Sequence, residues 1–452
     1  NGESIKTTGM VRLMVKYQGA KARLSFIVSP QVESMLLSKQ ACMTLGILHK
    51  GFPARINMTS KVESRQIPTK ADIVEEFADV FSTDGQLGTM HGKPMHITVK
   101  EDAVPFKVNG ARPIPFAMRD EVKTELDRLV TLGVIAPVTE PTDWCHPMSV
   151  QRKPNGKLRM CVDLRMLNKY VKRPVYPLRA PKDAVSNIPP SAKFFSTFDA
   201  TSGYWQVPLD EESQDLTVFI TPWGRFKHLR STMGLSSSGD EYCQRGDMAL
   251  EGLKDMEKIV DDVLLYKGEL LAHVLQVREF LERCRKAGIT LNPDKFQFCM
   301  QEVKFAGYIV TKDGIKADPA KVKAIAEFPK PTNITDLRSF LGLVEQLAPF
   351  SKDTAGTLGP LRPLLSKRNV FHWDGEHDQA FEKTKQALVS PPVLASYDPK
   401  LETTLYTDAS RTQGLGFVLV QKYPEGEKLV ECGSRFVTDT ESRYASRFPF
   451  EH

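Results

Sequence analysis

Three aspartates have the side-chain chemistry and the spacing that phosphoryl transfer would need. Asp199 ends one apolar run, and Asp261 with Asp262 follows 62 residues later between two further apolar stretches. If these stretches pair as strands, three carboxylates meet at one sheet edge, where like charges raise one another's pKa unless a cation neutralises them. Such oxygen ligands suit Mg²⁺, and two such ions can hold the attacking and leaving oxygens of an in-line displacement. An isolated Asp-Asp pair more often fills a solvated turn, so the neighbouring residues must decide.

The elements around these aspartates can be predicted from hydrophobic periodicity. Residues 194–198 predict a strand that leads into the first acid, and residues 258–266 predict a hairpin with both other acids at its tip. Helices are expected near 239–253 and over 270–287, the second ended by Gly288. Strands that alternate with helices, without a Rossmann glycine pattern, indicate an α+β palm-type layer in which one sheet is backed by helices.

A second predicted hairpin carries positive charge at its tip. Two strands, 148–151 and 158–162, flank Asn155-Gly156, which is a strong turn signal. Four cations bracket this turn, namely Arg152, Lys153, Lys157 and Arg159. Arginine suits bidentate phosphate contacts and lysine suits point-charge neutralisation, so a mobile tip of this kind could close over a triphosphate. The alternative is an ordinary solvated turn.

The segments around Asp199 and Asp261 resemble the catalytic motifs of reverse transcriptases from gypsy-type LTR retrotransposons. Residues 195–209, FSTFDATSGYWQVPL, look like the first motif, and residues 260–264, VDDVL, look like the second. The similarity runs from about Val104 to Ala445. The family usually has an aromatic residue two places before the acidic pair, where this chain has Ile259. An aliphatic residue there keeps the strand, so we expect an altered nucleotide fit rather than loss of metal binding.

The resemblance implies an RNA-directed DNA polymerase with roles for particular residues. Asp199 and Asp261 would bind two Mg²⁺ (or Mn²⁺) ions with help from the Ala200 carbonyl, while Asp262 would support the site. Tyr204 would lie beneath the sugar, where its ring would clash with a ribose 2′-OH; a core tyrosine is the alternative.

The resemblance also assigns contacts with the nucleotide and with the template-primer. The expected dNTP contacts are Arg152, Lys153, Arg159 and Lys295. The last of these falls near the family lysine proposed to protonate the leaving pyrophosphate, and a surface lysine is its alternative. The expected template-primer contacts are Gly234 in a loop of small residues, Gln244 on the helix that follows, and Gly307 with Tyr308 in the segment that resembles the primer grip.

The domain organisation implied is a right-hand polymerase with a remnant at each end. Residues 104–190 would form the fingers, 191–305 the palm with fingers and palm intermixed, and 306–372 the thumb. In the thumb, Leu337, Phe340, Leu341, Val344 and Leu347 recur at helical spacing and predict a core stripe. Residues 1–55, with a predicted hairpin over 9–29, resemble the C-terminal part of a retropepsin-like protease. Residues 56–103 are predicted to be a linker.

Residues 373–452 are predicted to be a connection and a truncated, RNase H-like α/β segment, with Asp408 as its first metal-binding acid. The resemblance fails after Ala445, because Pro449 would break the helix that carries the next catalytic glutamate. No Asp-Thr-Gly or Asp-Ser-Gly occurs anywhere in the chain. We therefore expect neither RNase H nor aspartic protease activity.

Composition and charge are compatible with this interpretation without proving it. The net charge is +6, and seven scattered cysteines without a Cys-x-x-Cys pair indicate neither a zinc site nor a disulfide framework. No stretch approaches 18 apolar residues, so no membrane span is expected. The implied partners are an RNA template, a DNA primer and product, and dNTPs, with a homodimer left open. The implied location is a cytoplasmic virus-like particle, or the nucleus. The alternative function is a catalytically inactive nucleic-acid-binding protein derived from such an element.

Overall fold

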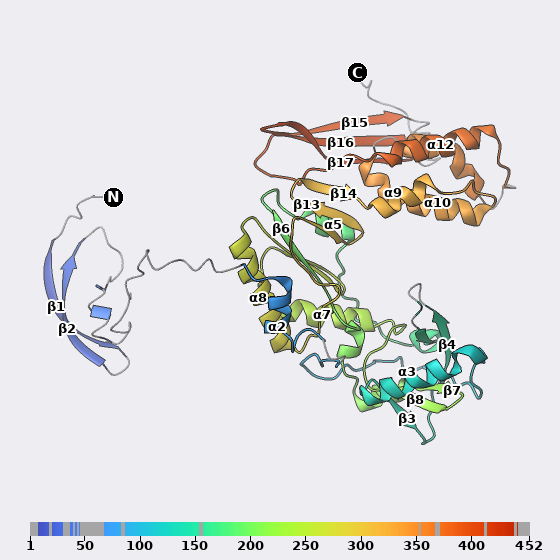
Figure 1. Cartoon of the computed structure of the whole chain (residues 1–452), viewed down its shortest axis with the longest axis horizontal. Helices are drawn as coiled ribbons and strands as arrows, with labels where there is room; N and C mark the ends of the chain where they lie inside the picture. Colours follow the sequence, from blue (N-terminus) through green and yellow to red (C-terminus); the bar gives the residue numbers. More distant parts are fainter. Residues whose placement is uncertain are drawn as a thin grey trace. The chain divides into compact units, whose positions relative to one another are not determined.

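The protein is described by a computed structural model. The described residues are 8–17, 20–29, 37–38, 41–42, 45, 67–82, 86–152, 156, 158–351, 354–366, 371–410, 414–437 and 441. The chain divides into two compact units, residues 1–67 and 68–452, whose elements are drawn in Figure 1. Each unit is considered by itself.

The first unit contains the predicted N-terminal hairpin. Strand β1 (Gly9–Tyr17) pairs antiparallel with β2 (Ala20–Val28), from Gly9 opposite Val28 to Tyr17 opposite Ala20. This confirms the hairpin predicted over residues 9–29. Most of the remaining retropepsin-like segment lies outside the described residues.

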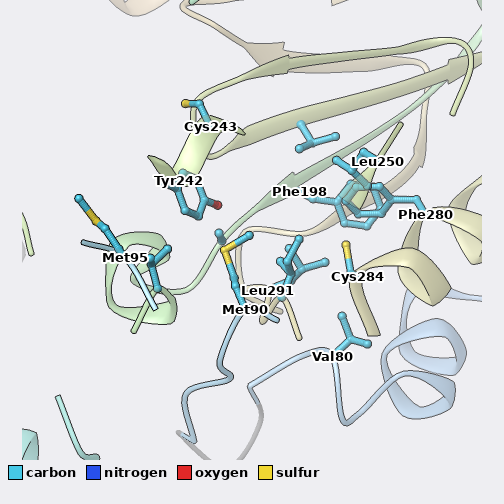
Figure 2. Packing of buried hydrophobic residues seen from close by; sticks show 14 of the residues in the cluster. Val80, Met90, Met95, Phe198, Tyr242, Cys243, Leu250, Phe280, Cys284 and Leu291 are labelled. Carbon is cyan, nitrogen blue, oxygen red and sulfur yellow. The ribbon is translucent and has the colours of Figure 1, made fainter. Parts of the chain in front are cut away.

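The second unit is centred on a four-stranded sheet with the order β11-β6-β10-β9. Its strands are β6 (Phe194–Asp199), β9 (Met256–Ile259), β10 (Asp262–Lys267) and β11 (Gln297–Met300). Helix α8 (Leu270–Ala287) packs on β6 and β10, and the rings of Phe198 and Phe280 are 4.4 Å apart (Figure 2). The helix ends at Gly288, which has a left-handed φ of 70°, as the sequence predicted.

The described part of the expected linker belongs to the palm core. Helix α2 (Lys70–Glu76) begins with a capping box at Thr69, and Ile73 and Phe77 on its inner face are at most 1% exposed. Met90 and Met95 join the same buried cluster (Figure 2). The prediction of a linker over 56–103 is therefore wrong for its described residues from Pro68 onward. The amphipathic spacing of α2 was visible in the sequence, but the surface that covers it comes from distant residues.

The fingers contain a five-stranded sheet with the order β3-β8-β7-β4-β5. Its strands are β3 (Ile135–Val138), β4 (His146–Arg152), β5 (Leu158–Val162), β7 (Phe219–Thr221) and β8 (Gly224–His228). Helix α3 (Arg119–Thr131) buries Val122, Leu126 and Leu129 in the cluster that also contains Phe219. Because β7 and β8 follow β6 in the chain, the backbone leaves the palm, completes the fingers sheet and returns through α7 (Ser238–Ala249).

A three-stranded meander leads from the palm to the thumb helices. It consists of β12 (Glu302–Phe305), β13 (Tyr308–Thr311) and β14 (Gly314–Ala317). The helices are α9 (Pro319–Ala326), α10 (Ile334–Leu347) and α12 (Gly375–Val389). Four of the five residues in the predicted stripe of α10 are fully buried, and Phe340 packs on Phe381 of α12 at 4.6 Å.

The last sheet is an antiparallel meander of β15 (Thr403–Ser410), β16 (Gly414–Tyr423) and β17 (Gly426–Arg435). The remaining described elements are short: η1 (Phe116–Met118), α4 (Arg165–Asn168), α5 (Pro181–Ser186), η2 (Gly203–Gln206), α6 (Glu211–Leu216), η3 (Ala348–Phe350), α11 (Thr354–Leu358) and η4 (Gly359–Leu365). Sheets and helices thus alternate in an α+β architecture, as the sequence predicted.

Candidate active site

The three aspartates meet at one end of the palm sheet. Strand β10 runs antiparallel to β6, and its register places Asp262 directly opposite Asp199. Asp262 also pairs with Ile259, so Val260 and Asp261 form the two-residue turn between β9 and β10. Directly opposed residues on neighbouring strands have Cβ atoms about 5 Å apart. The predicted hairpin is therefore present, but its turn lies one position earlier than predicted: Asp261 is in the turn, and Asp262 is the first residue of β10. The pairing of β10 with β6 brings Asp199 to the same edge.

The electrostatics of this edge are those of an acidic cluster that attracts cations. Loss of hydration raises the pKa of Asp262, and the carboxylates of Asp261 and Asp199 raise it further, while Lys295 lowers it. The Lys295 ammonium donates a hydrogen bond to Asp199 Oδ2 at 2.7 Å. That bond, followed by the charges of all three aspartates, raises the pKa of Lys295. Each group thus responds to the surplus of negative charge that a bound cation would relieve.

The donor set fits a hard divalent cation, although the side chains are not gathered around one point. Carboxylate oxygens and a backbone carbonyl at Ala200 are the ligands that Mg²⁺ prefers. Among the described residues, no three His, Cys, Asp or Glu side chains converge as a metal-holding group. The strand register brings the three aspartates to one sheet edge, as expected, but their side chains do not converge on one point. The Asp199 carboxylate is instead paired with the Lys295 ammonium.

The buried side chain of Gln206 holds the backbone after Asp199 in place. Its amide donates to the carbonyls of Thr201 at 2.7 Å and Thr290 at 2.8 Å, and its carbonyl accepts the Thr290 N–H at 2.8 Å. The Asn292 N–H in turn donates to the Asp199 carbonyl at 2.9 Å. These bonds tie the loop at Ala200 to the segment that leads to Lys295. Gln206 lies within the first motif but was not among the predicted site residues.

Tyr204 lies on η2, where it packs against helix α7. Its ring meets that of Tyr242 edge-on, at 5.7 Å and 88°. Gly203 makes this packing possible, because a Cβ there would lie 2.8 Å from the Tyr242 ring. Burial and then the nearby charge of Asp261 raise the pKa of Tyr204. Tyr204 is half-buried, so part of its side chain remains exposed to solvent.

The two arginines of the fingers hairpin point to opposite faces. Arg152 pairs with Leu158, whereas Arg159 pairs with Gln151. Side chains alternate along a strand and directly paired residues share a face, so Arg152 and Arg159 cannot project together. Arg152 binds Glu121 of α3 at 2.9 Å and the Gly156 carbonyl at 2.9 Å. The structure therefore does not bring Arg152 and Arg159 together as the sequence analysis expected. Lys153 and Lys157 lie outside the described residues.

The template-side residues occupy separate places. Gly234 has a φ of +89°, which only glycine adopts without strain. Asn168 clamps its loop, because its amide donates to the Gly234 carbonyl at 2.7 Å and its carbonyl accepts the Ser236 N–H at 2.9 Å. Gln244 lies exposed on α7, whereas its neighbours Tyr242 and Cys243 are buried. Asn168 is a further positioning residue that the sequence analysis did not single out.

The predicted primer-grip residues form the turn between β12 and β13. Phe305 pairs with Tyr308, and Ala306 and Gly307 between them have φ values of +52° and +85°. Lys321 of α9 donates to the Gly307 carbonyl at 3.0 Å, and its ammonium lies 6.0 Å from the centre of the Tyr308 ring. This turn is thus held from the thumb.

Asp408 lies on β15 opposite Gly416 and is exposed. Its carboxylate accepts the N–H of its neighbour Ala409 at 2.8 Å. The residues expected to follow it in an RNase H site, from 442 onward, lie outside the described residues.

Comparisons with known proteins agree with this geometry. Residues 151–310 match the family model of the reverse transcriptase (RNA-dependent DNA polymerase), and residues 373–448 match the RNase H-like domain found in reverse transcriptase. The chain is 32% identical over 354 residues to the retrovirus-related Pol polyprotein from transposon opus of Drosophila melanogaster, which covers 74% of this chain and 35% of that protein.

A second relative covers more of the chain. Identity is 28% over 430 residues with the transposon Tf2-3 polyprotein of Schizosaccharomyces pombe, which covers 94% of this chain and 31% of that protein. The chain therefore spans about a third of the length of the curated relatives it matches.

Solved structures share the fold. A foamy viral protease-reverse transcriptase in complex with double-stranded DNA has a TM-score of 0.74 at 20% identity, over 96% of this chain and 78% of that chain. The same kind of protein in complex with an RNA/DNA hybrid has a TM-score of 0.73 at 20% identity, over 96% of this chain and 60% of that chain.

The solved structures share the fold of this chain, and the acidic edge of the palm sheet lies within the residues that match the reverse transcriptase family model. The chain belongs to the Pol polyproteins of LTR retrotransposons, within which residues 151–310 are a reverse transcriptase domain. This confirms the family resemblance drawn from the motifs around Asp199 and Asp261. Within the described part of the chain, no helix has the length and apolar character needed to cross a membrane.

Proposed function

We propose that this chain is an RNA-directed DNA polymerase that adds deoxynucleotides to the 3′ end of a DNA primer on an RNA or DNA template. The observation that carries the proposal is the register that sets Asp262 opposite Asp199 at the sheet edge, with a lysine ammonium held on Asp199. The complexes of similar structures with double-stranded DNA and an RNA/DNA hybrid support these partners.

Reverse transcriptases generally use divalent metal ions, and the donor atoms here suit Mg²⁺ or Mn²⁺. Asp199, Asp261 and the Ala200 carbonyl would hold the ions, which supply charge stabilisation to the attacking and leaving oxygens. Asp262 would stay beside them as a supporting charge. Gln206 contributes by fixing the backbone at Thr201, so that the Ala200 carbonyl keeps its place next to Asp199.

The remaining residues divide between nucleotide contact and support. Arg159 would bind the triphosphate, and Lys295 would protonate the leaving pyrophosphate from its place beside Asp199. Arg152 would support the hairpin instead, because its guanidinium is already bonded to Glu121. The exposed part of the Tyr204 side chain would meet the sugar and exclude a ribose 2′-OH, while its ring packs on Tyr242.

The test is Mg²⁺-dependent incorporation of dTTP on a poly(rA) template with an oligo(dT) primer. Asp261→Asn should lower kcat by roughly 10³-fold or more, about 4 kcal/mol of barrier, because it removes a charge needed in the transition state. The matched control is Asp255→Asn. Asp255 lies just before β9 in the same hairpin, and its carboxylate pairs with Lys267. The control should keep incorporation within about twofold, because an exposed ion pair contributes little.

Two outcomes would count against the proposal. Equal losses in Asp261→Asn and Asp255→Asn would indicate that any change in the hairpin disables the fold. A wild-type chain that is folded and binds the duplex, yet incorporates nothing, would favour the inactive nucleic-acid-binding protein.

A further inference from the structure

Strand β9 carries two charged side chains that are almost completely buried. Glu257 is 4% exposed, and the side chain of Lys258 is 8% exposed. Both are paired with residues outside the palm sheet. Arg179 donates to Glu257 at 2.7 Å, and the Lys258 ammonium donates to Asp247 Oδ1 at 2.8 Å and to the Cys243 carbonyl at 3.3 Å. A buried charge is stable only when it is paired in this way, so β9 depends on its contacts with α7.

Helix α7 is shaped to receive Lys258. A Cβ at Gly246 would lie 2.8 Å from Lys258 Cε, so the absence of a side chain there makes room for the lysine stem. The other carboxylate oxygen of Asp247 accepts a hydrogen bond from the Tyr176 hydroxyl at 2.8 Å. One carboxylate therefore joins β9, α7 and the segment at Tyr176.

The same face of α7 is anchored a second time, two turns earlier. Asp240 is 1% exposed, and its carboxylate accepts the Tyr176 N–H at 3.0 Å and the Arg173 guanidinium at 3.0 Å. Between the two anchors, Tyr242 supports the ring of Tyr204. Helix α7 is thus the common support of the sugar-side tyrosine and of the strand that leads into Asp261.

We propose that Lys258 is a positioning residue for nucleotide transfer: through Asp247 it holds β9 against α7 and so fixes Asp261 relative to Tyr204 and Asp199. Lys258 precedes Asp261 by three positions, and its ammonium is committed to α7. This inference rests on the proposed polymerase function. It assigns Lys258, Asp247 and Gly246 a shared role that the motif around the aspartates does not include.

The first test compares Lys258→Met with Lys267→Met. Met keeps the length and apolar character of the lysine stem, so the first variant loses only the charge and its hydrogen bonds. Because a misplacement of about 1 Å can cost about 100-fold in rate, we expect kcat for dTTP incorporation to fall about 10- to 100-fold, with KM for dTTP changed by less than about threefold. Lys267→Met breaks the exposed Lys267–Asp255 pair at the far end of the same hairpin and should change kcat by less than about twofold.

A double variant separates positioning from stability. Lys258→Met alone leaves the Asp247 carboxylate without its cation. Lys258→Met with Asp247→Asn removes both charges, keeps an acceptor for the Tyr176 hydroxyl and should recover most of the lost Tm. The positioning role predicts that kcat stays low in the double variant. If kcat recovers together with Tm, Lys258 is merely structural and the inference is overturned.

Hydrogen exchange supplies a measurement that does not depend on catalysis. The backbone amides of residues 260–263 should exchange faster in Lys258→Met than in Lys267→Met, because only the former releases β9 from α7. Unchanged exchange at these amides would overturn the inference. A wild-type chain without incorporation would contradict the proposed function, while the exchange comparison would still decide whether Lys258 holds the tip.

Discussion

The catalytic hairpin β9–β10 and the primer-side hairpin β12–β13 have equally short turns but are held in different ways. The primer-side turn has positive φ at both Ala306 and Gly307, the combination that matches the twist of paired strands, and Lys321 bonds to the turn itself. In the catalytic turn, the β-branched residue Val260 takes the positive φ, 56°, and the supporting lysine lies on the strand behind it.

This difference indicates what each turn does. At the primer-side turn, the Gly307 carbonyl accepts a hydrogen bond from Lys321 of α9, so the turn itself is stabilised by the thumb. The catalytic turn carries Asp261, and the backbone at Val260 beside it is strained by its positive φ. Residues in sparsely populated φ/ψ regions cost about 1–3 kcal/mol and persist only when their surroundings hold them. The contacts of Lys258 and Glu257 with neighbouring elements supply that hold.

The largest expected effect on stability is at Gly307. Gly307→Val would place a β-branched residue at a φ of +85° and a Cβ only 2.7 Å from the Lys321 ammonium. We expect the free energy of unfolding to fall by about 2 kcal/mol, measured by urea denaturation. Gly342→Ala is the control: a Cβ there meets nothing within 4 Å, so this helical glycine should tolerate alanine with a gain of about 0.5–1 kcal/mol. If Gly307→Val is as stable as the wild type, the left-handed turn at Gly307 is not required.

A smaller effect is expected at Lys321. Lys321→Met removes the bond to the Gly307 carbonyl and the cation beside the Tyr308 ring, which together should lower the free energy of unfolding by about 1 kcal/mol. Lys323→Met on the same helix is the control, since its ammonium reaches only Glu327 at 3.8 Å.

The interaction with Gly307 can be isolated by a double-mutant cycle. Gly307→Val should cost less in the Lys321→Met background than in the wild type, because the clash with the ammonium is gone. If the two changes in the free energy of unfolding are additive, Lys321 and Gly307 do not interact in the folded protein.

Local pattern was enough to predict the catalytic hairpin. The apolar stretches on either side of Asp261 and Asp262 predicted the two strands, and β9 and β10 form there with the turn one position earlier than predicted. The helix over 270–287 was predicted to its last residue, because its apolar spacing and Gly288 are both local signals. The motifs around Asp199 and Asp261 then led to the family that the comparisons confirm.

What could not be predicted depends on contacts between distant segments. Helix α2 was assigned to a linker because its inner face is covered by residues about 200 positions away, such as Arg285, whose guanidinium lies 4.5 Å from the centre of the Phe77 ring. The face that Arg152 occupies depends on the strand register, which the composition of the hairpin does not specify. Lys258 lies on a strand and Asp247, eleven positions earlier, lies on a helix, so their pairing cannot be predicted from their spacing in the sequence.

Val260 offers a way to test whether the backbone strain in the catalytic turn serves the reaction. Val260→Gly should raise the free energy of unfolding by less than about 1 kcal/mol, because glycine adopts the positive φ freely but the packing of the half-buried Val260 side chain against the palm core is lost. The matched control is Val175→Gly, since Val175 has a φ of 51° and is 72% exposed. Both variants should gain stability, but only Val260→Gly should slow dTTP incorporation. Equal incorporation by the two variants would show that the strain at Val260 does not serve the reaction.

The smallest expected effects concern two aspartates, Asp262 and Asp318, whose pKa values are shifted in opposite directions. Loss of hydration, followed by the charges of Asp261 and Asp199, raises the pKa of Asp262 above its unfolded value. Burial also disfavours the charged form of Asp318, which caps α9, but hydrogen bonds from Lys304 and the Ala320 N–H outweigh it and keep the pKa of Asp318 below its usual value. The two groups should therefore contribute to the pH dependence of stability in opposite directions.

The sign for each aspartate follows from proton binding. Between the unfolded and the raised folded pKa, folded Asp262 binds more protons than the unfolded chain, so its contribution to stability falls as pH rises and stays unfavourable at pH 7. Asp262→Asn should then be more stable than the wild type at pH 7 by only a few tenths of a kcal/mol, because the exposed group is screened by solvent. The difference in the free energy of unfolding between Asp262→Asn and the wild type should vanish below the unfolded pKa. At pH 7, Mg²⁺ should make this difference smaller, because it neutralises the carboxylates of the wild type.

Asp318→Asn should behave in the reverse way. It removes a contribution that is present above the unfolded pKa and lost as pH falls through the lowered folded pKa, so the variant should be less stable than the wild type at pH 7 and should approach it in acid. Urea denaturation across this pH range, with and without Mg²⁺, measures both differences. If Asp262→Asn loses stability at pH 7 as Asp318→Asn does, then repulsion between Asp262 and the neighbouring carboxylates does not destabilise the folded protein, and the catalytic turn carries no electrostatic cost.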